Sequence, residues 1–386
     1  MNIFETDSTY VASTYARFPV EIVSGKGALV YGADGTEYID LGTGIAVNTF
    51  GSCDEEWIAA VTAQLHSVQH TSNLYYSSPC ARLAEQLCVR TGMKKVFFSN
   101  SGAEANECAI KAARKYACEK KGEDAYTILT LVNSFHGRTI TTLSATGQDS
   151  FHKLFTPMTP GFVHAPANDL EAVQKIADEM PLAGIMFEAV QGEGGVNPLS
   201  PEFVEGIAKI AQEKDILLIA DEVQCGNGRT GMLYGYMNYG ITPDVFTTAK
   251  GLGGGLPIGA TVLGEKVANV FAPGDNGSTF GGNPVSCAGA LNILSRLDDE
   301  MLEGVRLRSK MIFDALTGAR GVISVSGLGL MIGVETEKPA GDVIAACRDM
   351  GVLVIKAKNK VRLLPPLNIP TDLLVRALEI LKKACS

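Results

Sequence analysis

An acidic residue and a lysine stand at the ends of two successive apolar segments of this chain. Asp221 follows the apolar run ILLIA, and Lys250 lies between DVFTTA and the glycine run GLGGG. In open parallel sheets, ligands bind outside the carboxyl ends of the strands. A lysine that is desolvated at such an edge is a good Schiff-base nucleophile, because burial disfavours its charged form. Asp221 and Lys250 are therefore expected to face one site.

This pair of residue types matches the needs of pyridoxal phosphate. That cofactor requires a lysine that forms an imine and an acid opposite the pyridinium nitrogen. The glycines after Lys250 would let the backbone approach a ligand closely. Two alternatives stay open for the single residues: Asp221 as a cap on the next turn, and Lys250 as a surface lysine beside a flexible loop.

A third segment could bind the phosphate of such a cofactor. The apolar run FFSN leads into Ser101-Gly102-Ala103, where a helix is expected to begin. Helix N-termini bind phosphate through free N–H groups and the helix dipole. Gly102 would permit a close approach, and Ser99 or Ser101 would supply a hydroxyl. The alternative is an ordinary serine N-cap with Glu104 in the first turn.

Other local patterns are weaker. Phe135 and His136 offer flat rings, and Arg138 offers a fork that binds a carboxylate through two hydrogen bonds. The stretch GNGRTG (226–231) fits a dinucleotide fingerprint in letters only, because no helix is expected directly after it. His66 and His70 have helical spacing, but no third metal ligand is near, so a structural role on a helix face is expected.

The elements that must position these residues alternate between strand and helix, which favours βαβ units and a mainly parallel sheet. The turn at 33–35 predicts a hairpin, within an extended arm with small strands over 1–50. We expect a large domain over 51–285, with helices flanking the sheet, and a small α+β domain over 286–386. Helices are expected near 56–70, 78–91, 103–121, 169–179, 201–214 and 283–298, and strands near 126–132, 184–190, 216–220 and 244–249.

Composition narrows the functional classes. The chain has 386 residues and a formal net charge of −9, with no basic stripe, which argues against a nucleic-acid partner. No apolar run reaches membrane-spanning length, and the first ten residues do not resemble a signal peptide. Nine cysteines without a CxxC pair fit a reducing cytoplasm better than a disulfide framework.

These motifs together resemble the class III (fold type I) pyridoxal-phosphate aminotransferases. The resemblance spans nearly the whole chain and is strongest over residues 217–260, with SGAEANE, FHGRT, VQGEGGV, GSTFGGNP and RLLPPL in order. It implies the PLP-transferase fold, pyridoxal 5′-phosphate as cofactor, and a homodimer with shared active sites. No metal is implied.

The resemblance also implies roles for cofactor-binding residues. Lys250 would form the imine and then carry the transferred proton, and Asp221 would pair with the pyridinium nitrogen. The other expected contacts are Val223 and Phe135 on the two ring faces, Gln224 on the phenolic oxygen, Ser101, Gly102 and Ala103 around the phosphate, and Thr279 at the phosphate of the neighbouring subunit's cofactor.

On the substrate side, the resemblance implies two arginines that read carboxylates. Arg138 would hold the α-carboxylate of an ornithine-type donor, and Arg362 that of glutamate. Glu193 would screen Arg362 for one substrate and swing away for the other, unless it is only a turn residue. Tyr15 and Ser278 are expected near the substrate entrance.

The implied reaction moves the terminal amine of N2-acetylornithine to 2-oxoglutarate, as in arginine biosynthesis. Ornithine, succinylornithine, N-succinyl-diaminopimelate and 4-aminobutyrate are alternative donors. A non-catalytic binding protein would be expected to lack the lysine or the aspartate, and both are present. A racemase, mutase or decarboxylase would not need two carboxylate readers. Three departures from the family pattern, at 51–57, Ala189 and 276–277, leave Lys250 and Asp221 intact.

Overall fold

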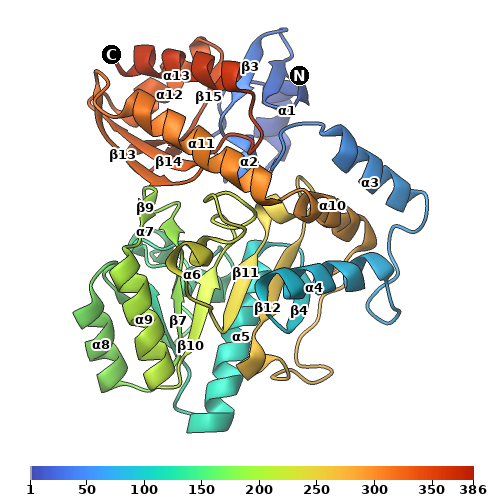
Figure 1. Ribbon diagram of the computed structural model, residues 1–386, viewed down its shortest axis with the longest axis vertical. Coiled ribbons are helices and arrows are strands. Elements are labelled where there is room, and N and C mark those ends of the chain that lie inside the picture. Colours follow the sequence, from blue (N-terminus) through green and yellow to red (C-terminus); the bar gives the residue numbers. More distant parts are fainter. Residues whose placement is uncertain (1) are drawn as a thin grey trace.

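The computed structural model describes residues 2–386, and its central element is a seven-stranded sheet in the order β4-β12-β11-β10-β7-β5-β6 (Figure 1). Strand β12 is antiparallel to both of its neighbours, and the other pairs of adjacent strands are parallel. The expected mainly parallel sheet is therefore confirmed, with one reversed strand that the sequence patterns did not indicate. The strands are β4 (Lys95–Ser99), β5 (Thr127–Leu131), β6 (Phe162–Ala165), β7 (Leu182–Phe187), β10 (Leu217–Asp221), β11 (Val245–Thr248) and β12 (Gly259–Leu263).

Helices cover both faces of this sheet, which explains why its central strands are apolar throughout. In β10, Leu217 and Ile219 belong to one apolar cluster, which includes Ala109, Ala112, Ala113 and Ala117 of α5 (Gly102–Lys121). Leu218 and Ala220 belong to the other cluster, with α9 (Pro201–Glu213). Successive side chains of a strand point to opposite faces, so Asp221 continues the row that faces α5.

Helix α5 begins where local signals place it. Ser101 is its N-cap, with the Oγ atom accepting a hydrogen bond from the Glu104 N–H at 3.2 Å. Alanine-rich sequence favours the helix interior, and Lys120 and Lys121 in the last turn suit the helix dipole. Gly122 follows at a positive φ of 97°. The helix thus starts at the carboxyl end of β4.

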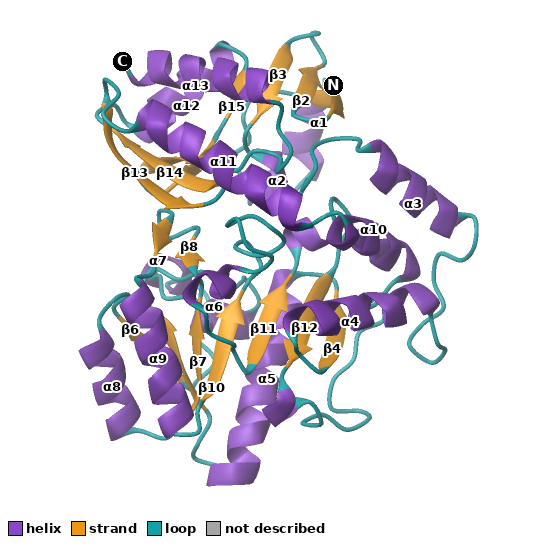
Figure 2. Ribbon diagram, viewed as in Figure 1, coloured by secondary structure: helices purple, strands orange, loops and turns teal. Residues whose placement is uncertain are grey.

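A second region, built around two smaller sheets, carries both termini and lies at one end of the molecule (Figures 1 and 2). Two four-stranded sheets occur there, in the orders β1-β2-β3-β15 and β13-β14-β17-β16. Strand β15 pairs with β3, so segments from the two ends of the chain share one sheet. The expected domain boundaries stay a prediction. The strands are β1 (Ile22–Lys26), β2 (Leu29–Gly32), β3 (Glu37–Asp40), β13 (Val322–Leu328), β14 (Met331–Thr336), β15 (Val352–Leu353), β16 (Ile355–Ala357) and β17 (Lys360–Leu363), and β8 (Val190–Gln191) pairs with β9 (Asn197–Pro198).

All six expected helices are present, most with shifted ends. The bounds of α5 and α9 are given above. The others are α2 (Thr43–Ala46), α3 (Glu55–Leu65), α4 (Ser78–Thr91), α6 (Ile140–Ala145), α7 (Asp149–His152), α8 (Leu170–Glu179), α10 (Pro284–Ser295), α11 (Asp299–Leu316), α12 (Ala340–Asp349), α13 (Thr371–Cys385), η1 (Gly235–Tyr239), η2 (Lys250–Leu252) and η3 (Glu265–Val267).

Three expectations about elements were wrong. The N-terminal arm contains a helix, α1 (Ile3–Tyr10), because Asn2 and Glu5 form a reciprocal capping box. Helix α3 ends at Leu65, so His66 and His70 do not lie on one helix face. Strand β7 ends at Phe187 rather than continuing to 190. No helix within residues 2–386 has the length and apolar character to cross a membrane.

Candidate active site

A cavity of about 600 Å³ lies at the carboxyl ends of β10 and β11. Residues from segments far apart in the chain meet around it, as expected for the edge of a parallel sheet. The predicted site residues that line it are Tyr15, Ser101, Gly102, Ala103, Phe135, Arg138, Asp221, Val223, Gln224 and Lys250. Those that do not line it are Glu193, Ser278, Thr279 and Arg362.

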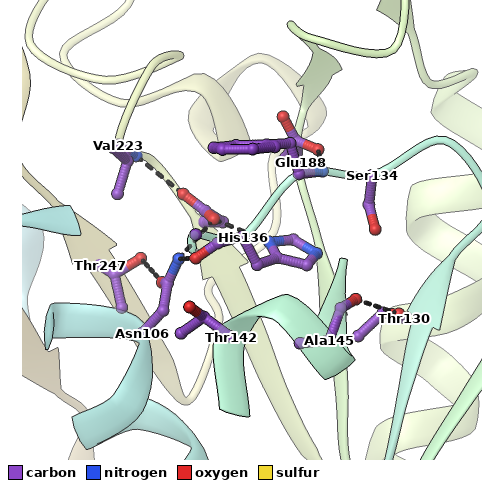
Figure 3. Close-up of polar contacts among 12 residues, drawn as sticks. Asn106, Thr130, Ser134, His136, Thr142, Ala145, Glu188, Val223 and Thr247 are labelled. Atoms are coloured by element: carbon purple, nitrogen blue, oxygen red, sulfur yellow. Dashed lines mark hydrogen bonds and ion pairs between the residues drawn. The ribbon is translucent and has the colours of Figure 1, made fainter. Parts of the chain in front are cut away.

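Asp221 accepts hydrogen bonds from Asn106, His136 and Val223, three residues that Figure 3 labels. Its Oδ2 atom accepts from Asn106 Nδ2 at 2.8 Å and from His136 Nδ1 at 2.7 Å. Its Oδ1 atom accepts from the Val223 N–H at 3.0 Å. Asn106 is held in turn by Thr247, whose hydroxyl donates to Asn106 Oδ1 at 2.6 Å. The pairing of β10 with β11 explains this network, because Thr247 stands directly opposite Asp221 on the face that α5 covers.

This network leaves one oxygen of Asp221 with spare accepting capacity. A carboxylate only accepts hydrogen bonds, so Nδ1 of His136 carries the proton of that contact. Burial lowers the pKa of His136, but the hydrogen bond and charge of Asp221 outweigh burial and raise the pKa overall. Oδ2 is committed to two protein donors, whereas Oδ1 has one. Oδ1 is therefore the better placed oxygen to accept an N–H from a bound ring.

Lys250 opens η2 directly after β11 and lines the same cavity as Asp221. Burial lowers its pKa, although the charge of Glu193 opposes that change. A lowered pKa increases the fraction of Lys250 that is the neutral amine, the form that can attack a carbonyl carbon. The backbone of Lys250 has a φ of +45°. Lysine rarely adopts this left-handed conformation.

The start of α5 combines a cap with free donors. The Ser101 hydroxyl donates to Glu104 at 3.0 Å, so the ordinary capping arrangement is present. A Cβ on Gly102 would come within 2.6 Å of Val223, so the packing against Val223 requires glycine at this position. The N–H groups of Gly102 and Ala103 have no acceptor within residues 2–386. They are the donors that an anion at this helix end would use.

Phe135 is anchored through its backbone by a buried acid. Glu188 accepts from the Phe135 N–H at 2.9 Å and from the Gly192 N–H at 3.2 Å. Burial raises the pKa of Glu188 to about 7. Arg138 is exposed, with its guanidinium carbon 5.1 Å from the centre of the Phe151 ring. No acidic side chain pairs with Arg138 within the described part of the chain, so its fork is free for a ligand.

Arg362 lies behind the cavity in an ion pair with Glu193. Arg362 is only 2% exposed, and its Nη1 lies 2.7 Å from Glu193 Oε1. Nη1 also donates to Gln224 Oε1 at 3.0 Å, and Gln224 lines the cavity. Burial raises the pKa of Glu193, but the positive charge of Arg362 more than reverses this and lowers it. The glutamate and arginine that the resemblance pairs are thus in contact.

Three predicted residues lie at the margins. Tyr15 borders the cavity and is 73% exposed. Ser278 is half-buried, and its Oγ accepts from Asn100 at 3.1 Å. Thr279 is exposed, and its hydroxyl has no partner within residues 2–386. Thr279 does not line the cavity.

The sequence reasoning missed the residues that hold Asp221 and Phe135. His136 was considered only as a flat ring, and Asn106, Thr247 and Glu188 had no assigned role. Asn106 carried a usable signal, since it is a polar residue one helical turn after Gly102 in an alanine-rich helix. In the GNGRTG stretch, Arg229 is buried and donates to the Leu330 carbonyl. Within residues 2–386, no three His, Cys, Asp or Glu side chains gather as a metal ion would require.

The chain is similar to known proteins over nearly its full length. The sequence model described as Aminotransferase class-III matches residues 10–385. An acetylornithine aminotransferase from Haemophilus ducreyi is 49% identical over 100% of this chain and 98% of its own. The solved ornithine aminotransferase from Toxoplasma gondii ME49 matches with a TM-score of 0.95 at 32% identity, over 99% of this chain and 94% of its own. The N-acetylornithine aminotransferase from Stenotrophomonas maltophilia matches with a TM-score of 0.86 at 33% identity, over 99% and 98%.

Proposed function

This chain belongs to the class III aminotransferase family, and from that membership we propose that it transfers the terminal amine of N2-acetylornithine to 2-oxoglutarate. The products are N-acetylglutamate 5-semialdehyde and glutamate, which places the enzyme in arginine biosynthesis. The observation that supports this donor most strongly is the 49% identity to an acetylornithine aminotransferase over the full chain. The pairing of a free Arg138 with a guarded Arg362 supports two substrates that both carry carboxylates.

Pyridoxal 5′-phosphate is the cofactor of this family, and the cavity fits it. Asp221 offers an accepting oxygen for a ring N–H, and the free N–H groups of Gly102 and Ala103 suit a phosphate. When bound, the cofactor withdraws electrons from the carbon that bears the substrate amine, so that a proton can leave that carbon. Val223 and Phe135 would contact the two faces of the ring, and Gln224 would donate to its phenolic oxygen.

Within this proposal, Lys250 attaches the cofactor covalently and later moves a proton. Its lowered pKa supports both tasks, because a neutral amine is both nucleophile and base. Asp221 would hold the positive charge on the ring nitrogen. Asn106 and His136 would keep that carboxylate oriented, since both donate to Oδ2.

The two arginines would divide the substrates between them. Arg138 would bind the α-carboxylate of the donor through its free fork. Arg362 would bind the α-carboxylate of glutamate once Glu193 has moved away. While the donor is bound, Glu193 would stay on Arg362 and neutralise a buried cation that would otherwise lack a charged partner. Tyr15 and Ser278 would border the substrate entrance.

The proposal includes a homodimer. The exposed Thr279, without an internal partner, would reach the phosphate site of the second protomer. The enzyme would act in the cytoplasm. All nine cysteines are free, which is compatible with a reducing compartment.

A comparison of amino donors, each assayed separately, tests the choice of donor. The purified enzyme would be given 2-oxoglutarate with N2-acetylornithine, ornithine or 4-aminobutyrate, and kcat/KM would be compared. We expect the highest value for N2-acetylornithine. A higher value for ornithine would keep the enzyme class and overturn the proposed donor. Acyl groups are discriminated only modestly by pockets, so measurable activity with the second-best donor is expected.

A further inference from the structure

Lys250 holds a backbone conformation that its own residue type disfavours. Its φ is +45°, in the left-handed region that glycine or asparagine usually occupies. Non-glycine residues stay in such conformations only where the surroundings over-determine them. The direction in which the Lys250 side chain leaves the backbone therefore depends on whatever fixes the adjacent peptides.

Three side chains hold alternate carbonyl groups around Lys250. Asn227 Nδ2 donates to the Ala249 carbonyl at 3.2 Å, and Thr49 Oγ1 donates to the Gly251 carbonyl at 2.7 Å. Trp57 Nε1 donates to the Gly253 carbonyl at 3.1 Å. The donors come from separate segments: the turn after β10, the loop after α2, and α3. The Ala249 carbonyl belongs to the peptide that directly precedes Lys250, and the Gly251 and Gly253 carbonyls belong to peptides farther along the glycine run. The three bonds therefore fix the backbone before and after Lys250.

The glycine run after Lys250 makes this arrangement possible. A Cβ at Gly251 would lie 2.9 Å from Thr49 Oγ1, and a Cβ at Gly254 would lie 2.9 Å from Trp57 Nε1. Side chains there would push the donors away. The expectation that these glycines mainly admit a ligand is therefore incomplete, because Gly251 and Gly254 admit protein donors. Of the run, only Gly255 lines the cavity.

We propose that Thr49, Asn227 and Trp57 are positioning residues that keep Lys250 in its left-handed conformation and aim its amine into the cavity. Thr49 is the most informative of the three. It is 2% exposed, and its hydroxyl is the one donor that reaches the Gly251 carbonyl among the described hydrogen bonds. The Ala249 and Gly253 carbonyls also accept from backbone N–H groups. This inference rests on the proposed role of Lys250 as the cofactor-binding lysine.

The test measures covalent and non-covalent cofactor binding separately in the Thr49→Val variant and in wild type. Apoenzyme would be mixed with pyridoxal phosphate, and the rate of imine formation would be followed by absorbance. Borohydride trapping and mass spectrometry would confirm attachment at Lys250. In parallel, the affinity for pyridoxamine phosphate would be measured, since that molecule has no aldehyde and needs no lysine. We expect Thr49→Val to slow imine formation about tenfold, as for loss of one buried hydrogen bond, and to leave pyridoxamine phosphate affinity unchanged.

Two further variants serve as controls. Thr336→Val removes a hydroxyl that also donates to a carbonyl at 2.7 Å, from a buried residue of β14 that does not line the cavity. It should lose similar stability and keep the wild-type imine rate. Thr49→Ser keeps the donor and should also behave as wild type. Trp57→Phe, which removes only the indole N–H donor and part of the ring, should slow imine formation in the same way, and it replaces Thr49→Val if that variant does not fold.

Three outcomes would contradict the inference. The first is an imine rate in Thr49→Val and Trp57→Phe equal to that of Thr336→Val. The second is an equal loss of imine rate and pyridoxamine phosphate affinity, which would indicate general loosening of the site. The third is a wild-type protein that forms no imine with Lys250, which would overturn the proposed function as well. The positioning role is supported if wild type forms the imine with Lys250, and if Thr49→Val forms it more slowly but binds pyridoxamine phosphate with unchanged affinity.

Discussion

Glu193 Oε1 lies 2.7 Å from Arg362 Nη1, in a pair whose arginine is 2% exposed. Arg138, by contrast, is exposed and has no acidic partner within residues 2–386. The two arginines that the sequence analysis assigned to carboxylate binding thus differ in readiness. One is open to a ligand, and the other must first lose its glutamate. This difference gives each arginine a separate experimental signature.

Replacing Arg138 should affect the donor half of the reaction. Arg138→Gln removes the charged fork, and we expect kcat/KM for N2-acetylornithine to fall about 10- to 100-fold, as for loss of a charge-assisted hydrogen-bonded pair. The measurement is the rate of each half reaction in a stopped-flow spectrophotometer. The glutamate half reaction should change much less. Equal losses in both halves would show that Arg138 does not discriminate between the substrates.

Replacing Glu193 should affect the other half. In Glu193→Gln the cation of Arg362 has no competing carboxylate, so KM for 2-oxoglutarate should fall severalfold. Glu303→Gln is a matched control, because Glu303 also lies 2.7 Å from an arginine, Arg306, but on the surface. Surface pairs contribute little, and this control should keep wild-type kinetics. An unchanged KM in Glu193→Gln would argue against the screening role.

The Glu193–Arg362 pair should also give a pH-dependent contribution to stability. The folded-state pKa of Glu193 lies below its ordinary value of 4.5, with Arg362 as the cause that outweighs burial and with a smaller effect from Lys250. The stabilisation is therefore complete above the ordinary pKa and is lost as the pH falls through the lowered value. The free energy of unfolding of wild type minus that of Glu193→Gln should shrink between a pH of about 7 and about 3.

Glu188 does not obscure that comparison. Its pKa is raised to about 7 by burial, so its own effect has the opposite sign and weakens the fold as the pH rises through that value. Both proteins contain Glu188, and its contribution cancels in the difference. A difference that grows on acidification would contradict the assigned direction of the Glu193 shift.

Much of the site could be predicted because its residues follow regular strands. The apolar run before Asp221 and the one before Lys250 indicated two strands, and parallel pairing brings their carboxyl ends together. What could not be predicted was the contact set of Asp221. His136 comes from a loop between β5 and α6, and nothing in its local sequence fixes the direction of its ring. Such contacts depend on how loops fold over the sheet edge.

Local signals also gave an incomplete account of some positions. Gly102 is expected to let a phosphate approach, which stays a prediction, and its missing Cβ also makes room for Val223. Residues 3–10 were expected to be extended, but the Asn2–Glu5 capping box stabilises a helix there. Helix α1 has no buried side chains, so the capping signal was the only one available.

Subunit complementation tests the proposed sharing of sites. If Thr279 serves the partner's cofactor, a Lys250→Ala chain and a Thr279→Ala chain can combine into a heterodimer with one intact site. Unfolding and refolding the two inactive variants together should restore activity to about a quarter of wild type, because about half of the dimers are mixed and each has one working site. No recovery, in a mixture shown by mass to contain heterodimers, would place Thr279 outside the partner's site.

The most direct test of the account is a single half reaction. Purified protein would be loaded with pyridoxal phosphate, and N2-acetylornithine would be added without any oxo acid. We predict that the imine absorbance is lost to a pyridoxamine-type spectrum, that 2-oxoglutarate restores it, and that Lys250→Ala loaded with pyridoxal phosphate shows no imine band before an amine is added. An imine band in Lys250→Ala before any amine is added, or a wild-type spectrum that no amine donor changes, would contradict the central claim that Lys250 carries the cofactor of an aminotransferase.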